Sequence, residues 1–362
     1  MKITGIEPIH VAIPFDQGAP APTEGLGSGG TLDIVFVHVD TDEGITGWGE
    51  AFSPAGAPVM ITALTRIIAP MAIGRAANDV AALMRELFFR TKGMSRNGPV
   101  AYALSGVDIA LWDIKGKAEG RPIWQLLGGA PKPRVPAYAS LLRLREHVGT
   151  VAAKAAEAGF RHIKLHEHDA SAVNAAYAAI NGHAAMMVDV NCYWPTVEAA
   201  LAAARTMAPL AWLEEPLYPP DDFAEYARLR RERVVPVAGG ENLGNVLDVR
   251  RMCETGAVDV VQPSLAKMGG ITEMMKAIAV ARQCGTRLVP HSPYSGPALA
   301  ATVQVIAAAG DDDMLCEHRY CELAASPFAN WPDTRDGFLR VPQGPGLGVE
   351  IDGKVIAKYR VA

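Results

Sequence analysis

The feature that most constrains the fold is a row of polar residues in the second half of the chain, each closing a short apolar run. The residues are Lys164, Asp189, Glu214, Glu241, Ser264, His291 and Glu317. Successive members are 25, 25, 27, 23, 27 and 26 residues apart. A strand, a loop, an amphipathic helix and a return loop use about that many residues. The spacing therefore predicts a parallel α/β sheet, in which the carboxyl ends of the strands carry the chemistry.

The alternation of strand and helix begins one unit earlier, with the segment VPAYASL at 135–141, so that eight strands are expected. Helical patterns follow the strands at 147–159, 170–180, 195–208, 221–232, 244–255, 270–283 and 294–309. Eight strands with intervening helices fit a TIM-type barrel better than an open sheet. An open sheet would usually have a Gly-rich phosphate turn after its first strand, and none is visible here.

The first part of the chain has a different pattern, in which strands precede helices. Alternating segments at 3–15 and 31–40 lead through the turn TDEG into ITGWGEAF, which is typical of antiparallel strands joined by a hairpin. Apolar residues at three- and four-residue spacing then predict helices between 58 and 120, and Gly120 is expected to end the last one. This order predicts an α+β domain.

We therefore expect two domains in this chain of 362 residues, an α+β domain at 1–125 and a barrel domain at 126–325. The tail at 326–362 is expected to be extended and to pack back on the first domain. A loop at 15–30 is rich in Gly, Pro and small residues, and is either a functional lid or a flexible connector.

The composition excludes several classes of function. The net charge is −5, so neither nucleic acid nor a membrane surface is expected as a partner. The five cysteines are scattered without a CxxC motif, which is typical of a reducing cytosol and not of disulfides or a zinc site. The N-terminus is too polar for a signal peptide, and no segment is apolar enough for a membrane span. We expect a cytoplasmic protein.

Three successive members of the polar row, Asp189, Glu214 and Glu241, are carboxylates. Because they end consecutive strands, their side chains are expected to converge at one rim, where they would repel one another without a cation. Mg²⁺ is expected, because it binds carboxylates and keeps open positions for water and substrate oxygens. Any one of them could instead cap a helix or form a surface ion pair, but three in succession favour a metal site.

Candidate proton-transfer groups lie before these carboxylates in the sequence. Lys164 and His166 are two residues apart on one predicted strand, so both are expected to point into the barrel. A lysine near a metal in a low-dielectric rim loses part of its preference for the charged form, so we expect the pKa of Lys164 to fall toward neutrality. Alternatively, Lys164 is a counter-ion of the carboxylates and His166 a polar rim residue.

Two further candidates, His291 and Glu317, end later strands, and His291 is expected to lie across the barrel from Lys164. Two bases on either side of a metal could act on opposite faces of one carbon, although His291 could also be a buried structural histidine. Glu317 could donate a hydrogen bond to a substrate carboxylate if protonated, or bind a lysine if ionised. The set suits removal of a proton next to a carboxylate, because a divalent cation stabilises the developing charge.

The segments that carry these residues resemble the enolase superfamily, and within it the mandelate racemase subgroup, over nearly the whole chain. They are LSGVDIALWDIKGKAEGRPIWQLLGG, KLH, DVN, LEEP, GGEN, QPSLAKMGGIT, PHSPYSGPALAA and PQGPGLGVEID. The resemblance implies an α+β capping domain over a (β/α)7β barrel, a small-molecule carboxylate substrate, and a homo-oligomer from dimer to octamer.

The resemblance also implies roles for the polar row. Mg²⁺ would be held by Asp189, Glu214 and Glu241, with Glu214 and not Glu215 as the ligand from the Glu-Glu-Pro segment. Lys164 would be one base.

Outside the metal ligands, the resemblance implies His291 as the second acid/base and Glu317 as hydrogen-bond donor to the substrate carboxylate. Asn191 and Arg96 are candidates for contacts with the substrate, and the loop at 15–30 would cover it together with the segment near Arg96.

Two residues depart from the family pattern. His166 replaces the second lysine of the family's Lys-x-Lys strand, and it remains a candidate catalytic residue. Ser264 replaces the aspartate that orients the catalytic histidine. A serine hydroxyl can bind an imidazole or a substrate, but it cannot stabilise an imidazolium by charge, so His291 is expected to be a weaker base than in a His–Asp pair.

The leading hypothesis is a Mg²⁺-dependent hydro-lyase that dehydrates a hydroxy acid, such as an acid sugar, to a 2-keto-3-deoxy acid. Lys164 would remove the α-proton and His291 would help the β-hydroxyl leave as water. The alternative is a racemase, epimerase or lactone cycloisomerase with the same first step. A catalytically silent scaffold is the third hypothesis, and the four converging charged groups argue against it.

Overall fold

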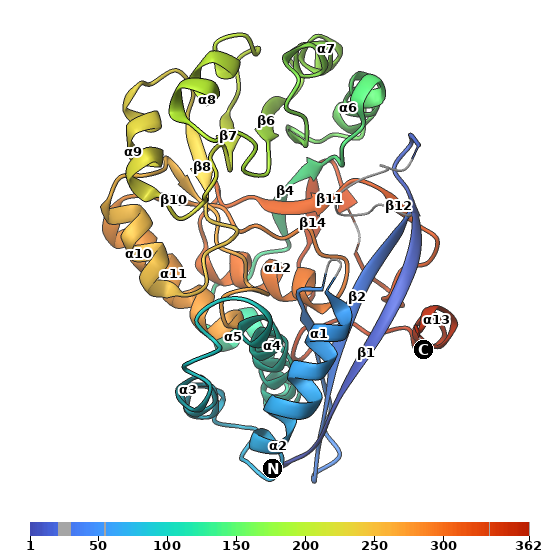
Figure 1. Cartoon of the computed structure of the whole chain (residues 1–362). Helices are drawn as coiled ribbons and strands as arrows, with labels where there is room; N and C mark the ends of the chain where they lie inside the picture. The colour runs from blue at the N-terminus through green and yellow to red at the C-terminus, as the bar shows by residue number, and fades with distance from the viewer. Residues whose placement is uncertain (21–29, 54–55, 333, 362) are drawn as a thin grey trace.

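The computed structural model describes residues 1–20, 30–53, 56–332 and 334–361. The described chain forms a four-stranded antiparallel sheet with helices on one side, next to a larger, mainly parallel sheet surrounded by further helices. Figure 1 shows the antiparallel sheet in blue at the lower right and the green-to-orange strand–helix units above and to the left of it. The part of the chain that can be described contains no helix long and apolar enough to cross a membrane.

The antiparallel sheet has the order β12-β1-β2-β3. Its strands are β1 (Ile3–Asp16), β2 (Thr31–Thr41), β3 (Gly47–Ala51) and β12 (Glu322–Leu323). β1, β2 and β3 pair antiparallel as predicted, because alternate residues such as Val35 and Val37 are fully buried against the helices. Strand β12 joins the edge from the far end of the chain.

Helices pack on this sheet in the order predicted. They are α1 (Ala57–Thr62), the π-helical segment η1 (Ala63–Ile68), α2 (Ala69–Ala72), α3 (Val80–Arg90) and α4 (Pro99–Glu119). Pro99 begins α4 and Gly120, with φ of 65°, ends it, as expected from the sequence. β3 approaches α4 closely because Gly49 has no side chain; a Cβ there would lie 1.9 Å from the Gly106 carbonyl oxygen.

The larger sheet has the order β10-β9-β8-β7-β6-β5-β4-β14-β13, and β11 pairs with β4. Its parallel strands are β4 (Arg134–Ser140), β5 (His162–Leu165), β6 (Ala185–Asp189), β7 (Trp212–Glu214), β8 (Val237–Gly239), β9 (Val260–Val261), β10 (Arg287–Leu288) and β11 (Cys316–Arg319). The eight expected strands therefore form. No backbone ladder joins β10 to β11 in the described residues, but the Ser292 N–H donates to Glu317 Oε2 (2.9 Å) across that seam.

Helices follow the parallel strands and cover the outside of the sheet (Figure 1). They are α6 (Val148–Glu157), α7 (Ala170–Ile180), α8 (Val197–Ala204), α9 (Phe223–Arg231), α10 (Val246–Glu254), α11 (Gly270–Cys284) and α12 (Pro297–Ala309). The short helices α5 (Ile123–Leu126) and η2 (Arg145–His147) precede them. Polar caps fix several starts: Asp169 accepts from the Ser171 N–H, and Asn245 from that of Leu247.

The tail differs from the prediction in one respect. It contains strands β13 (Thr334–Arg335) and β14 (Phe338–Arg340), but it ends in a helix, α13 (Gly353–Tyr359), where an extended chain was expected. Asp352 caps α13 by accepting from the N–H groups of Lys354 and Val355, a signal that the sequence interpretation missed. The tail contacts both sheets, since β14 pairs with β4 and the Val361 N–H donates to the His10 carbonyl on β1.

Candidate active site

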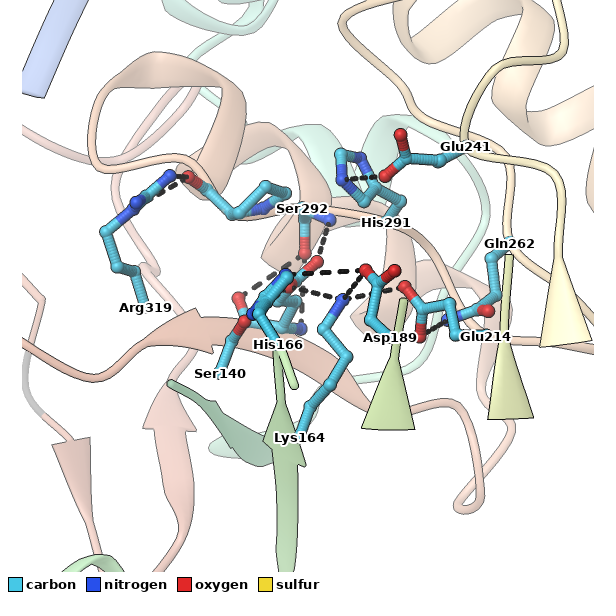
Figure 2. A network of polar contacts seen from close by, with 12 residues as sticks. Ser140, Lys164, His166, Asp189, Glu214, Glu241, Gln262, His291, Ser292 and Arg319 are labelled. Carbon is cyan, nitrogen blue, oxygen red and sulfur yellow. Dashed lines mark hydrogen bonds and ion pairs between the residues drawn. The ribbon is translucent and has the colours of Figure 1, made fainter. Parts of the chain in front are cut away.

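The site is organised around the ammonium group of Lys164, which is fully buried at the end of β5 (Figure 2). Its Nζ lies 2.7 Å from Glu214 Oε1, 2.9 Å from Glu317 Oε1 and 3.4 Å from Asp189 Oδ2. The register of the sheet brings these groups together, because Asp189 and Glu214 are direct partners on β6 and β7. Ser140 lies beside Lys164 on β4 and donates to Glu317 Oε1 (2.7 Å).

The charge state of this cluster differs from the expectation for Lys164. Burial disfavours the ammonium, but the Glu214 and Glu317 carboxylates outweigh it and raise the pKa of Lys164 well above its usual value. The expected fall of this pKa toward neutrality, which assumed a metal ion beside Lys164, stays a prediction for the metal-bound site. Burial opposes ionisation of Glu317 too, but Lys164 lowers the pKa of Glu317 to about 2. Glu317 is thus ionised and binds the lysine, which is the second of the two roles considered for it.

Three carboxylates form a set that could hold a metal ion. One oxygen from each of Asp189, Glu214 and Glu241 lies within 4.8 Å of the others. Glu214 is held by two further donors, Gln262 Nε2 at 2.9 Å and Trp212 Nε1 at 3.1 Å. An all-oxygen set of this kind, with buried carboxylates aimed at one point, fits a hard divalent cation.

The adjacent Glu215 has a different role. Its Oε1 accepts from the backbone N–H groups of Gly240 (2.7 Å) and Glu241 (3.2 Å), and its Oε2 accepts from Tyr226 Oη (2.9 Å). Burial raises the pKa of Glu215 to about 7. Glu215 therefore holds the loop that carries Glu241, while Glu214 points into the carboxylate set.

The imidazole of His291 lies on the Glu241 side of the site. Its Nε2 is 2.8 Å from Glu241 Oε2, and Lys267 Nζ is 3.5 Å from Glu241 Oε1. The other ring nitrogen, Nδ1, is buried and has no hydrogen-bond partner among the residues described. The expected contact with Ser264 is not formed, because the Ser264 hydroxyl bonds to the Tyr294 hydroxyl instead.

His166 lies on the opposite side of the set, half-buried. Its Nδ1 is 2.5 Å from the Leu141 carbonyl oxygen, which makes Nδ1 the donor, and its Nε2 is 3.4 Å from Asp189 Oδ2. Asn191 follows Asp189 in a left-handed conformation (φ 47°), and its N–H donates to Asp189 Oδ1 at 2.9 Å. Both residues therefore position Asp189.

A cavity of about 470 Å³ lies over these groups. Of the predicted site residues, it is lined by His166, Asp189, Asn191, Glu241 and His291. Lys164, Glu214 and Glu317 are fully buried beside it. Arg96 and Ser264 do not line it: Arg96 is exposed, with its carbonyl oxygen 3.4 Å from Asn245 Nδ2, and Ser264 is wholly buried.

The antiparallel sheet completes the cavity with residues that the sequence interpretation did not single out. Leu32, Asp33, Glu50, Phe52 and Ser53 line it from β2 and from β3 and the segment after it. The predicted lid at 15–30 falls largely on residues 21–29, which lie outside the described residues.

Arg319, the last residue of β11, also lines the cavity. Three other cavity residues were missed on the loops after the parallel strands. Arg143, His168 and Tyr193 follow the ends of β4, β5 and β6 by only a few residues. The rule that placed the polar row at strand ends could have identified them, but it was applied only to the first polar residue of each unit.

The fold and the carboxylate set define a member of the enolase superfamily, with an N-terminal cap and a C-terminal TIM-type barrel. The chain belongs to the mandelate racemase/muconate lactonizing enzyme family: residues 15–128 match the model of that family's N-terminal domain, and residues 147–355 match that of the enolase C-terminal domain-like region. The motif-based family prediction is therefore confirmed.

Relatives of the chain share its full architecture. It is 31% identical over 348 residues to D-galactarolactone cycloisomerase from Agrobacterium fabrum, which covers 90% of this chain and 91% of that protein. It is 31% identical over 346 residues to D-galactonate dehydratase from Ralstonia pickettii, with 89% and 90% covered. The crystal structure of a racemase from Streptomyces coelicolor A3(2) with bound magnesium has a TM-score of 0.86 and 27% identity, over 99% and 100% of the two chains.

Proposed function

We propose that this protein is a Mg²⁺-dependent dehydratase of a hydroxylated carboxylic acid, an acid sugar, and that it forms a 2-keto-3-deoxy acid. The observation that carries the proposal is the position of two proton-transfer groups on one carboxylate set. Lys164 contacts Asp189 and Glu214 from one side, and His291 contacts Glu241 from the other. Relatives named galactonate and arabinonate dehydratases, about 30% identical, support the reaction class.

Mg²⁺ would be held by Asp189, Glu214 and Glu241, whose converging oxygens suit it. When bound, it supplies electrostatic stabilisation of the negative charge that develops on a substrate carboxylate during loss of the α-proton. A magnesium-bound structural neighbour supports the choice of metal.

In this mechanism Lys164 removes the α-proton. Its high pKa arises from the unshared charge of Glu214 and Glu317. A divalent cation bound to Glu214 and Asp189 would neutralise part of the charge of these carboxylates. The ammonium form of Lys164 would then be less stabilised, and the pKa of Lys164 would fall toward the range of a general base. Glu317, itself anchored by Ser140, keeps the amine in place.

His291 then acts as the acid that protonates the departing β-hydroxyl. Its Nε2 faces the carboxylate set, whereas Nδ1 lacks a carboxylate partner. Without that partner an imidazolium formed by taking a proton from carbon lacks the second carboxylate of a His–Asp pair, and Glu241, the one carboxylate it contacts, belongs to the metal set. This asymmetry favours dehydration over two-base racemisation.

Cycloisomerisation of an acid-sugar lactone is the second candidate, since it needs only one base and a carbon-protonating acid. The relatives named D-galactarolactone cycloisomerase and 3,6-anhydro-alpha-L-galactonate cycloisomerase favour it as the alternative. Racemisation or epimerisation ranks below both. A silent scaffold has no need for a buried lysine among three carboxylates, since such a cluster is costly to bury.

We also propose the domain division at 125/126 and a (β/α)7β barrel closed between β10 and β11 through Ser292 and Glu317. The two mutual contacts of that pair support closure, with the Glu317 N–H donating to Ser292 Oγ at 3.2 Å. The homo-oligomer remains a prediction, which light scattering would test.

The test is to incubate the protein and Mg²⁺ with a library of acid sugars and their lactones in D₂O. Formation of 2-keto-3-deoxy acids supports the dehydratase. Lactone rearrangement without keto-acid supports the cycloisomerase, and an epimerised but undehydrated acid would refute the leading proposal. Absence of both Mg²⁺ binding by calorimetry and α-deuterium incorporation would support the scaffold.

A further inference from the structure

Two guanidinium groups, those of Arg143 and Arg319, line the cavity without an anionic partner. Arg319 donates from Nε (3.3 Å) and from one terminal nitrogen (3.0 Å) to the Pro293 carbonyl oxygen, and Arg143 contacts His168 Nε2. Within the described part of the chain, neither forms an ion pair with a carboxylate. Both therefore carry a positive charge that the protein itself does not neutralise by direct contact.

The two arginines lie in the same sector of the site. Arg319 is on β11 two residues after Glu317, so its side chain leaves the same face about 6–7 Å farther along the strand. Its Cα partner on β4 is Ser140, and Arg143 follows three residues later. In Figure 2 Arg319 lies to the left of the Lys164 cluster, and Glu241 lies at the upper right. Arg319 thus lies on the side of the cluster opposite to Glu241 (Figure 2).

Two aromatic rings stack on the rim of the cavity beside Arg143. The His168 and Tyr193 rings stack with centroids 3.9 Å apart and planes at 7°. Burial and the neighbouring Arg143 both lower the pKa of His168, so its Nε2 is free to accept from the Arg143 guanidinium. The stack therefore holds Arg143 at the mouth of the cavity and leaves the rest of its donors for a ligand.

The acidic residues that line the cavity near these arginines form hydrogen bonds with other groups. Asp33 Oδ1 lies 2.7 Å from His10 Nε2, and Glu167 Oε1 accepts from two backbone N–H groups at 2.8 and 2.7 Å. Glu50 accepts from the Ala298 N–H (2.8 Å) and lies within electrostatic range of Arg319 but forms no ion pair with it. Burial raises the pKa of Glu50 to about 7, so it is only partly ionised near neutral pH.

We propose that Arg319, with Arg143 at the mouth, binds a second carboxylate of the substrate, so that the enzyme prefers polyhydroxy diacids or their monolactones to aldonic acids. The proposal rests on the function proposed above for the reacting end of the substrate. With the first carboxylate near Lys164 and the metal ligands, Arg319 lies two residues farther along β11 than Glu317 and lines the same cavity. Planar guanidinium groups bind carboxylates in a bidentate manner, whereas the terminal hydroxyl of an aldonic acid needs no charge.

The test compares a hexaric acid with the hexonic acid of the same configuration. In the wild type we expect kcat/KM to be higher for the diacid. Arg319→Met and Arg143→Met should lower kcat/KM for the diacid by about 10- to 100-fold, the cost of losing a charged hydrogen bond, and leave the monoacid within about 3-fold. Arg145→Met is the control, because Arg145 lies in the same loop, is exposed and does not line the cavity.

A binding measurement separates this proposal from the reaction itself. Calorimetric titration with an unreactive diacid and its monoacid analogue, adipate and hexanoate, should show tighter binding of adipate, which Arg319→Met abolishes. Preference for the hexonic acid, or equal losses for both substrates in the arginine variants, would overturn the proposal while leaving the proposed function intact. If adipate binds through Arg319 but no acid sugar exchanges its α-proton, the proposed function fails and the anion site stands.

Discussion

The Nε2 atom of His291 lies 2.8 Å from Oε2 of Glu241, and the opposite ring nitrogen of His291 is buried without a hydrogen-bond partner in the described part of the chain. His291 therefore contacts the carboxylate set through Nε2, whereas no carboxylate of the described residues contacts Nδ1. This relationship distinguishes the two sides of the site. Lys164 is surrounded by carboxylates, whereas His291 has only one, and that one belongs to the candidate metal site.

Substitution Ser264→Asp should strengthen His291 as a base. The β-bridge between Ser264 and His291 brings the new carboxylate next to the imidazole, where it can stabilise an imidazolium. We expect α-deuterium incorporation into a substrate of the opposite α-configuration to rise by about 10-fold or more relative to dehydration. Tyr294→Phe is the matched control, because it removes the present partner of Ser264 without adding charge. An equal gain in both variants would mean that the charge is not the cause.

Substitution Lys164→Ala should abolish α-proton exchange while the barrel remains folded. A positioned base contributes on the order of 10²–10⁴-fold, so exchange should fall to the lower limit of detection by NMR in D₂O. His166→Gln serves as a comparison, since His166 contacts Asp189 only at 3.4 Å and should lose much less. Full exchange by a folded Lys164→Ala variant, with folding checked by circular dichroism, would mean that the base is misassigned.

Removal of divalent cations should destabilise the protein. The carboxylates of Asp189 and Glu214 are buried and that of Glu241 is partly buried; they repel one another, and a bound ion relieves that repulsion only in the folded state. At a Mg²⁺ concentration of 100 times Kd, we expect about 2.7 kcal/mol of added stability, measured by denaturant unfolding with and without EDTA. Asp189→Asn should lose most of this gain. A stability that does not respond to Mg²⁺ would contradict the metal assignment.

The pH dependence of stability should reflect Glu50. Burial raises its pKa in the folded protein to about 7, against about 4.5 in the unfolded chain. The folded state therefore binds the extra proton between these values, and the free energy of unfolding falls as pH rises from about 4.5 to 7, by at most about 1.4 kcal/mol per pH unit. Glu50→Gln should reduce this slope, to which Glu215 and Asp108 still contribute because burial raises the pKa of each to about 7. Glu43→Gln, at an exposed site, should leave the slope unchanged, and an unchanged slope in Glu50→Gln would refute the assignment.

The order of elements could be derived from the sequence because each element satisfies local rules. The spacing of Lys164, Asp189 and Glu214 corresponds to one strand–helix unit, and the caps at Asp169, Asn245 and Gly120 lie where the sequence has a polar residue or a glycine. The missed helix α13 obeys the same rules, since Asp352 caps it; only the Gly- and Pro-rich context obscured it.

The sequence alone therefore determined which residues lie at the strand ends. Residues that end consecutive strands must meet, because the sheet is parallel and each helix returns the chain to the same side. The sequence motifs alone also identified the superfamily. Tertiary structure alone decided how charge is distributed among those residues. Glu214 and Glu317 together raise the pKa of Lys164, and Glu317 reaches it from β11 across a long sequence separation.

Tertiary structure alone also decided the partners of Ser264 and the cavity wall. The Ser264 hydroxyl bonds to Tyr294 and not to the His291 imidazole, and Arg319 lines the cavity without a counter-ion among the residues that the structure describes. Such contacts depend on side-chain directions and distances between segments far apart in the chain. No local pattern encodes them, because burial and Coulomb interactions act over a few ångströms in space and not along the sequence.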